Sequence, residues 1–191
     1  ENVARFIETY NTEVDRWQNR IKKTMTLDDF VLSEEHKIKW SSRLKECLVR
    51  RQKAIFSEEK IRRALYRPFG CQSLFFDDIL THRQGQFPKI CPTPATEPEN
   101  QIICCTNHSQ IPFVVQITNY LAEYAVGGRT TQCFPFYTYS EDGSNRQENI
   151  TDWALKTFRT HYRSRKLTKW DIFYYVYGLL HHPGYREKYA A

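Results

Sequence analysis

The sequence lacks the features that mark a membrane or secreted protein. Its apolar runs fall short of the roughly 18–20 residues that span a bilayer, and no cleavable signal segment opens the chain. Its 6 cysteines include no CxxC pair and follow no regular spacing, so they indicate neither a zinc finger nor a disulfide framework. These absences predict a cytoplasmic protein with small buried thiols and no membrane partner.

Enzyme motifs are also missing. The chain has no GxGxxG, GxxxxGK[ST] or GxSxG sequence, and no Asn-Pro-Pro-Tyr type tetrad for amino methylation of a base. One Glu-x-Lys, Glu58 to Lys60, resembles part of a nuclease motif, with acids available at 28–29 or 77–78. It falls in the first turn of an expected helix, where the helix dipole already favours Glu. We therefore expect a non-catalytic chain without metal or cofactor, with metal-dependent cleavage as the least favoured reading.

Charge is present but unevenly distributed. The 191 residues are 40% hydrophobic and 15% aromatic, enough for a sizeable core, and carry a net charge of +6. Residues 33–67 and 156–169 are strongly basic, whereas residues 90–150 are acidic. Segregated positive charge favours an anionic polymer partner, chiefly nucleic acid, and solvated helix faces are the alternative.

Hydrophobic periodicity predicts helices at both ends of the chain and strands between them. Helices are expected over 2–21, over 34–53 with Ser33 as N-cap, and over 57–66 with Ser57 as N-cap. Strand-like runs are expected at 73–76, 101–105, 113–118 and 132–139. The fold class is thus α+β, with a helical N-terminal part, a β-rich middle with irregular loops and a helical C-terminal part.

The last third carries the clearest helix signals. Thr151 is expected to cap one helix and Thr168 a second one, with Asp171 completing a capping box. The second helix is apolar nearly all round, which predicts a core element, and Pro183 ends it. The polar segment 140–149 is then a structured connector between a strand and the Thr151 helix.

Four stretches resemble a known family: YRPF (66–69), DDILTHRQGQFP (77–88), CFPFYTYSEDGSNRQENITDWAL (133–155) and LTKWDIFYYVYGLLHHPGYREKYAA (167–191). They are similar to the C-terminal specificity region of type ISP restriction–modification enzymes, which are bacterial single-chain proteins. Residues 60–191 show the resemblance well. It implies a helical segment at the methyltransferase boundary over 1–56 and a target-recognition domain over 57–191, whose family motif continues beyond Ala191. With no Met at its start, we expect the chain to be a piece of a longer protein.

The resemblance also implies a function. In this family a nuclease, a helicase-like motor and an N6-adenine methyltransferase precede the recognition domain on one polypeptide. The expected partners are therefore double-stranded DNA, read at a short asymmetric site, and the methyltransferase and motor domains. No S-adenosylmethionine or ATP site is expected here. The alternative is an intramolecular scaffold that docks the methyltransferase to the motor without touching DNA.

Side-chain chemistry nominates the DNA contacts. Arg reads guanine and Gln reads adenine in the major groove, while basic side chains mostly hold phosphates. The base-reading candidates are Arg83, Gln84, Gln86, Arg129, Thr131 and Gln132. The phosphate candidates are Lys60, Arg62, Arg63, Lys89, Arg146, Lys156, Arg159 and Arg163.

Overall fold

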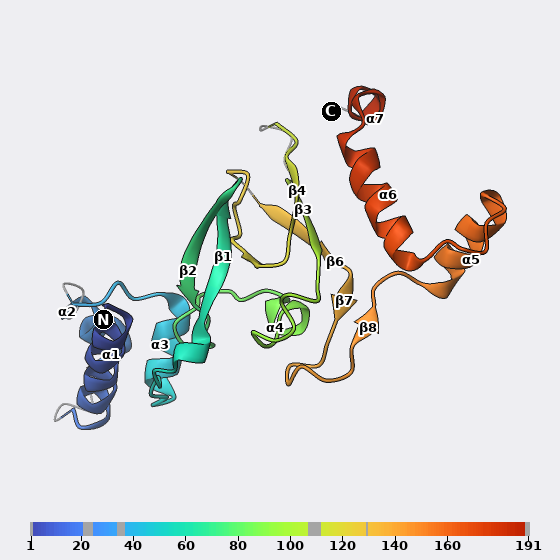
Figure 1. The fold of residues 1–191 in the computed structure, drawn as a ribbon. Coiled ribbons are helices and arrows are strands. Elements are labelled where there is room, and N and C mark those ends of the chain that lie inside the picture. The colour runs from blue at the N-terminus through green and yellow to red at the C-terminus, as the bar shows by residue number, and fades with distance from the viewer. Residues whose placement is uncertain (1, 21–24, 34–36, 107–111, 129, 190–191) are drawn as a thin grey trace. The chain divides into compact units, whose positions relative to one another are not determined.

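The computed structural model describes residues 2–20, 25–33, 37–106, 112–128 and 130–189 (Figure 1). It forms two compact units. The first comprises Glu1–Arg62 and Ser73–Gly85, and the second comprises Arg63–Gln72 and Gln86–Ala191. Helices lie near both ends of the chain and strands lie in the middle, which confirms the α+β prediction. No helix of the described residues is long and apolar enough to cross a membrane. The domain boundary after residue 56 stays a prediction.

Three helices build the core of the first unit: α1 (Asn2–Gln18), α2 (Leu27–Ser33) and α3 (Ser42–Val49). Helix α1 buries Tyr10 and Val14 completely, as its amphipathic pattern predicted. The helix predicted over 34–53 is wrong in its extent, because residues 38–41 are not helical and the cap is Ser41, whose hydroxyl accepts a bond from the Leu44 N–H. The predicted first turn at 34–35 lies outside the described residues.

The helix predicted over 57–66 is wrong. A single 3-10 turn, η1 (Glu58–Lys60), leads into strand β1 (Ile61–Arg67), which a two-residue turn joins to β2 (Gly70–Phe75). Ser57 makes no side-chain capping bond, and burial alternates along the start of β1, as in a strand with one buried face. Short patterned segments of this kind are ambiguous, and pairing with a distant strand decides them. Here β1 runs parallel to β5 (Leu121–Ala122).

The second unit holds the remaining strands. One sheet has the order β2-β1-β5, and a second has the order β4 (Val115–Thr118), β3 (Ile102–Thr106), β6 (Thr131–Pro135) with antiparallel pairing. A short ladder joins β7 (Tyr137–Thr138) to β8 (Gln147–Glu148), and α4 (Phe87–Ile90) is a single turn. The expected strand runs are thus confirmed, with shifted ends.

Three helices end the chain: α5 (Asp152–His161), α6 (Lys169–His181) and α7 (Pro183–Tyr189). The predicted caps are confirmed, since Thr151 accepts from the Ala154 N–H and Thr168 forms a capping box with Asp171. The segment 140–149 before α5 is the expected structured connector, and it contains β8, which pairs with β7.

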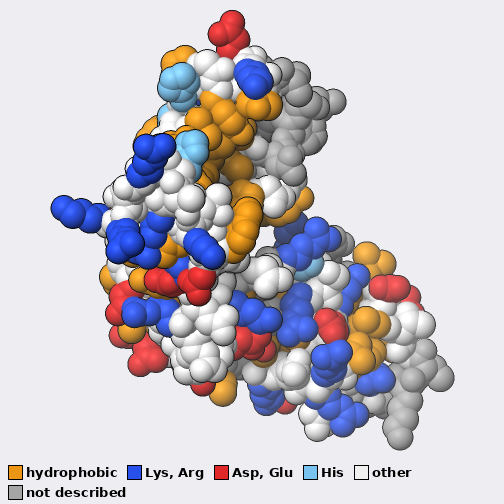
Figure 2. Space-filling view, turned by 90° about the vertical axis from the view of Figure 1, so that its right-hand side faces the viewer, with side chains coloured by type: hydrophobic (Ala, Val, Ile, Leu, Met, Phe, Trp, Pro, Cys, Tyr) orange, Lys and Arg blue, Asp and Glu red, His pale blue; other side chains and the backbone are white. Residues whose placement is uncertain are grey.

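Helix α6 is a core element on one side only, although its sequence is apolar nearly all round. Ile172 and Phe173 are buried, and the Trp170 ring next to them stacks on Phe136 with a centroid distance of 3.5 Å. On the rest of the helix, however, Tyr174, Tyr175 and Val176 remain 46%, 47% and 40% exposed. The helix therefore buries one side in the second unit and presents an apolar side at its surface. Figure 2 shows orange side chains gathered on the upper part of the face that it draws.

Candidate nucleic-acid interface

Helix α5 carries a row of cations along one face. Lys156 and Arg159 are three residues apart and lie on the same side of the helix, and Arg163 follows the C-cap Tyr162 with a φ of 51°. Together with Arg165 they line an open groove of about 690 Å³, which we call the α5 groove. Its lining is completed by Asp152, Leu155, Thr160 and Ser164. Such a row of positive charge along a groove suits a chain of phosphates.

Three of the four cations that line the α5 groove lack an ion-pair partner in the part of the chain that the structure describes. Lys156, Arg163 and Arg165 make no ion pair with any carboxylate among the residues that the structure describes. The nearby acid, Asp152, is paired with Lys169 instead, at 2.7 Å, and this ammonium lowers the pKa of the Asp152 carboxyl. Arg159 is held in place because its Nε donates to the Leu167 carbonyl at 2.9 Å. The groove thus offers one fixed cation, Arg159, and three cations that have no carboxylate partner within the described ranges.

A second recess in the same unit is lined by amide and hydroxyl side chains. It has a volume of about 560 Å³, and we call it the amide recess. It is assembled from α4, β6, β7, β8 and the loop between the last two strands. Its polar side chains come from Gln86, Lys89, Thr138, Ser140, Asn145, Gln147 and Asn149. Asn and Gln side chains both donate and accept hydrogen bonds, which is the pattern that reads a base edge.

The amides of this recess divide into two groups. Asn145 donates to the Ser140 hydroxyl at 3.0 Å, and Asn149 donates to the Pro135 carbonyl at 3.1 Å. Gln86 and Gln147 are exposed, and within the described chain their side chains form no hydrogen bond. The first pair therefore holds the loop in shape, and the second pair is available to a ligand.

The structure separates the base-reading candidates. Gln86 lies in the amide recess, with the phosphate candidate Lys89 beside it. Arg83 and Gln84 belong to the first unit, where Arg83 is exposed and adopts a φ of 62°. Of the candidates predicted in this loop, the amide recess therefore contains Gln86 and Lys89, whereas Arg83 and Gln84 belong to the first unit.

The candidates around residue 130 have different surroundings. Arg129 lies outside the described residues. Thr131 accepts a bond from the Val126 N–H at 3.0 Å, which gives its hydroxyl a role in the turn before β6. Gln132 is exposed on β6, directly before Cys133, which lines the amide recess. Because side chains alternate along a strand, Gln132 points to the face of β6 opposite that of Cys133 and lies outside the amide recess.

Several phosphate candidates already have partners. The helix face expected to carry Lys60, Arg62 and Arg63 does not exist, because these residues lie in η1 and β1. Arg62 is 6% exposed and lies over the Phe76 ring, whereas Arg63 is exposed over the Tyr120 ring. Arg146 pairs with Glu99 at 2.8 Å. Contact of these side chains with DNA stays a prediction.

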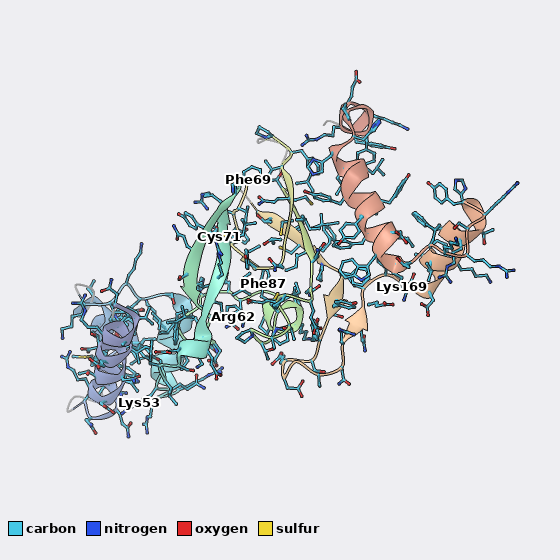
Figure 3. All side chains as sticks on the ribbon, in the orientation of Figure 1. Lys53, Arg62, Phe69, Cys71, Phe87 and Lys169 are labelled. Carbon is cyan, nitrogen blue, oxygen red and sulfur yellow. The ribbon has the colours of Figure 1, made fainter. Side chains whose placement is uncertain are left out.

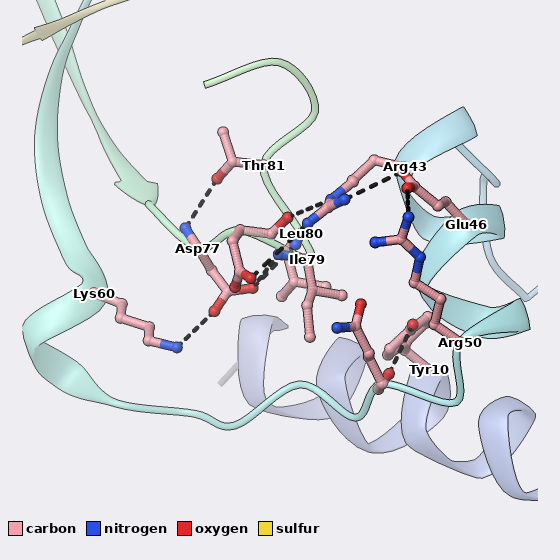
Figure 4. A network of polar contacts seen from close by, with 11 residues as sticks. Tyr10, Arg43, Glu46, Arg50, Lys60, Asp77, Ile79, Leu80 and Thr81 are labelled. Carbon is pink, nitrogen blue, oxygen red and sulfur yellow. Dashed lines mark hydrogen bonds and ion pairs between the residues drawn. The ribbon is translucent and has the colours of Figure 1, made fainter. Parts of the chain in front are cut away.

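Lys60 takes part in a network around Asp77 (Figure 4). The Asp77 carboxylate is buried and accepts from Lys60 Nζ at 2.6 Å on one oxygen. Its other oxygen accepts from the backbone N–H groups of Ile79 at 2.8 Å and Leu80 at 3.1 Å. Lys60 therefore compensates a buried charge, which is a structural role that the sequence pattern did not reveal.

The described residues do not form the metal site that the nuclease hypothesis requires. Glu58 lies exposed in η1, and Asp77 is occupied as described above. Over the described ranges, no group of three or more His, Cys, Asp or Glu side chains is placed to hold a metal ion. The cysteines are free, and Cys104 faces Cys133 across the β3–β6 ladder with 3.8 Å between the sulfur atoms.

Sequence reasoning missed Gln147, Thr138 and Arg165. The available signal for Gln147 was the polar run at 143–149, which resembles the other reading loops but was interpreted as scaffold. Arg165 lies just beyond the end of α5, so the helical spacing that identified its neighbours did not include it.

Comparison with known proteins gives consistent matches. The family model described as Type ISP C-terminal specificity domain matches residues 1–191. The cryoEM structure of the DrdV–DNA complex is 36% identical, with a TM-score of 0.82, over 98% of this chain and 18% of that one. A nuclease-deletion mutant of the type ISP restriction–modification enzyme LlaGI, in complex with a DNA substrate mimic, is 32% identical, with a TM-score of 0.79, over 99% and 16%.

A third structure, the ATP-dependent type ISP restriction–modification enzyme LlaBIII bound to DNA, shares the fold. Its TM-score is 0.74 at 23% identity, over 95% of this chain and 12% of that one. The chain thus spans less than a fifth of the length of these solved chains. No curated protein that was compared matches it.

Proposed function

The chain belongs to the family of type ISP C-terminal specificity domains, as its sequence motifs predicted, and on this premise we propose that it recognises a short sequence in duplex DNA without catalysing a reaction itself. One observation carries the proposal: the α5 groove holds three cations that have no protein partner among the described residues. Unpaired surface cations in a row are the electrostatic footprint of a phosphate backbone. The similar DrdV and LlaGI structures were solved with DNA, which supports the same partner here.

The proposal divides the work between two surfaces. The α5 groove binds phosphates and so sets affinity and orientation, while the amide recess contacts base edges and so sets specificity. Gln86 and Gln147 are the readers, because their amides are exposed and unengaged in the described chain. Gln132 and Arg83 remain further candidates. In the intact protein, the methyltransferase and motor domains of the same polypeptide would act on the site that this domain selects.

A selection from randomised duplexes at moderate salt tests this function. The variants are Gln86→Ala and Gln147→Ala, with Arg83→Ala and Arg129→Ala in parallel and Gln18→Ala, an exposed glutamine of α1, as the matched control. A relaxed preference at one base position identifies a reader, and uniform weakening identifies a phosphate contact. Wild-type protein that enriches no sequence would refute the proposal. Binding should persist in EDTA and without S-adenosylmethionine or ATP, because the proposal assigns no cofactor to the domain.

The scaffold function remains the second candidate, and one observation favours it. The apolar side of α6, with Tyr174, Tyr175 and Val176 at the surface, is a surface that another domain can cover. If this docking were the whole function, changes in the α5 groove would leave DNA binding by the intact protein unchanged. Changes on α6, such as Tyr174→Asp, would instead loosen the association between domains.

A further inference from the structure

The turn between β1 and β2 exposes an aromatic ring. The Phe69 side chain is 93% exposed, the highest value given for a large hydrophobic residue in the described chain. Figure 3 shows Phe69 at the tip of the hairpin that these two strands form. The ring makes no aromatic contact within the described residues. It therefore contributes nothing to the hydrophobic core.

The backbone at this position is strained. Proline holds φ near −65°, and Phe69 follows Pro68 with a φ of 63°, so the turn has the sign pattern of type II. The third position of a type II turn favours Gly or Asn, because a bulky side chain fits poorly at positive φ. Gly70 lies one residue too late to relieve this. The hairpin thus carries a ring that burial does not require, in a conformation that disfavours it.

The strand leading to this turn places arginines against aromatic rings. The Arg63 guanidinium lies 5.1 Å from the centroid of the Tyr120 ring and has no ion-pair partner in the described part of the chain. The Arg67 guanidinium lies 4.1 Å from the Tyr66 ring and also pairs with Glu123 at 3.1 Å. Arginines interleaved with exposed rings are typical of nucleic-acid surfaces, where the cations meet phosphates and the rings stack on bases.

From these observations we infer that Phe69 is a stacking wedge, which enters an opened base step of the bound duplex and stacks on a base. The inference rests on the proposed DNA-binding function and adds a contact that reads DNA deformability, not base edges. Apolar side chains that enter base steps unstack them and bend the duplex, and sequences that open easily are then favoured. The strain at Phe69 is explained in the same way, since the ring is held out for a partner.

The test uses the intact natural protein and the duplex recovered from the randomised selection, with 2-aminopurine placed at each position in turn. Wild type is expected to raise the fluorescence of the probe at one step, because the probe brightens when it is unstacked. Phe69→Asn keeps a residue that tolerates positive φ but removes the ring. We expect its affinity to fall about tenfold, which corresponds to about 1.4 kcal/mol.

Two further readouts separate the wedge from other roles. Phe69→Tyr keeps the aromatic face and should retain both the affinity and the fluorescence signal. The dependence of affinity on salt should be the same for wild type and Phe69→Asn, because the ring neutralises no phosphate. The Tm of Phe69→Asn should equal or exceed that of wild type, because the strain is relieved.

The outcomes distinguish this inference from the function on which it rests. If wild type binds no duplex, the proposed function fails. If wild type binds and Phe69→Asn binds equally well with the same fluorescence, the wedge is refuted, and contact of Phe69 with another protein domain becomes the better reading. Weaker binding by Phe69→Asn with no bright 2-aminopurine position in wild type also refutes it, because no base has then been unstacked.

Discussion

Removing charge from the α5 groove should change how DNA binding depends on salt. Lys156 and Arg163 lie seven residues apart on α5 and its end, and neither has a carboxylate partner in the described chain. Each one that neutralises a phosphate contributes about −0.9 to the slope of log affinity against log salt. The double variant Lys156→Gln, Arg163→Gln should therefore have a slope shallower by about 1.8.

The same slope gives the loss of DNA affinity that each phosphate contact causes when the salt concentration rises. Between about 50 and 200 mM salt, one phosphate contact accounts for a roughly 3.5-fold change in affinity, and two contacts account for a roughly 12-fold change. Fluorescence anisotropy with the selected duplex, titrated at four or more salt concentrations, measures both slope and affinity. The matched control is Lys39→Gln with Arg5→Gln, two exposed cations of the first unit. An unchanged slope in the α5 variant, or an equal change in the control, would show that the groove does not hold phosphates.

Three further predictions concern the parts of the fold that support this surface. Lys60→Met should destabilise the protein by about 2 kcal/mol, because it leaves the buried Asp77 carboxylate without its cation, and it should leave the salt dependence of DNA binding unchanged. Chemical denaturation measures the stability and the anisotropy titration measures the salt slope; a shallower slope with unchanged stability would show that Lys60 contacts DNA instead. Thr168→Val should cost about 1 kcal/mol and lower the Tm by about 2–4 °C, because it removes the α6 cap; a thermal melt in which the Tm does not change would contradict the capping geometry. The Thr168 hydroxyl and N–H donate to Asp171 and lower the pKa of its carboxyl, so the stability that the ionised carboxylate contributes is present above the unfolded pKa of about 3.9 and is lost as pH falls through the lower folded pKa. Asp171→Asn should therefore lose less stability than wild type on acidification. Denaturation measured at a series of pH values would contradict this prediction if both proteins lost stability equally.

Local signals predicted the C-terminal helices and failed at the hairpin. A cap such as Thr151 or Thr168 acts on an N–H three residues away, so the sequence contains all of its information. Ser57 and the acids after it gave the same local signal, but β1 pairs with β5, which lies more than fifty residues further along the chain. A partner at that distance overrides a helix start that the nearby residues favour.

The same distinction explains the site. Two cations of the α5 groove were predictable, because helical spacing puts Lys156 and Arg159 on one side of α5; Arg163 follows the C-cap of the helix with a φ of 51°. The amide recess was not, because Gln86, Thr138 and Gln147 come from different elements and meet only in the folded chain. Composition likewise predicted that α6 is buried, although the helix packs on one side only. A sequence pattern identifies an apolar surface but does not show what covers it.

The arrangement of the amide recess has a consequence for specificity. Its shape depends on two amides that already make hydrogen bonds: Asn145 donates to the Ser140 hydroxyl, and Asn149 donates to the Pro135 carbonyl. Its exposed amides, Gln86 and Gln147, bond nothing within the described residues, so the fold gains little from their identity. Surface side chains of this kind can usually be exchanged at a cost below about 0.5 kcal/mol. Under the proposed function, an exchange at Gln86 before α4 or at Gln147 in β8 changes the DNA sequence that is read and leaves the fold around the recess unchanged.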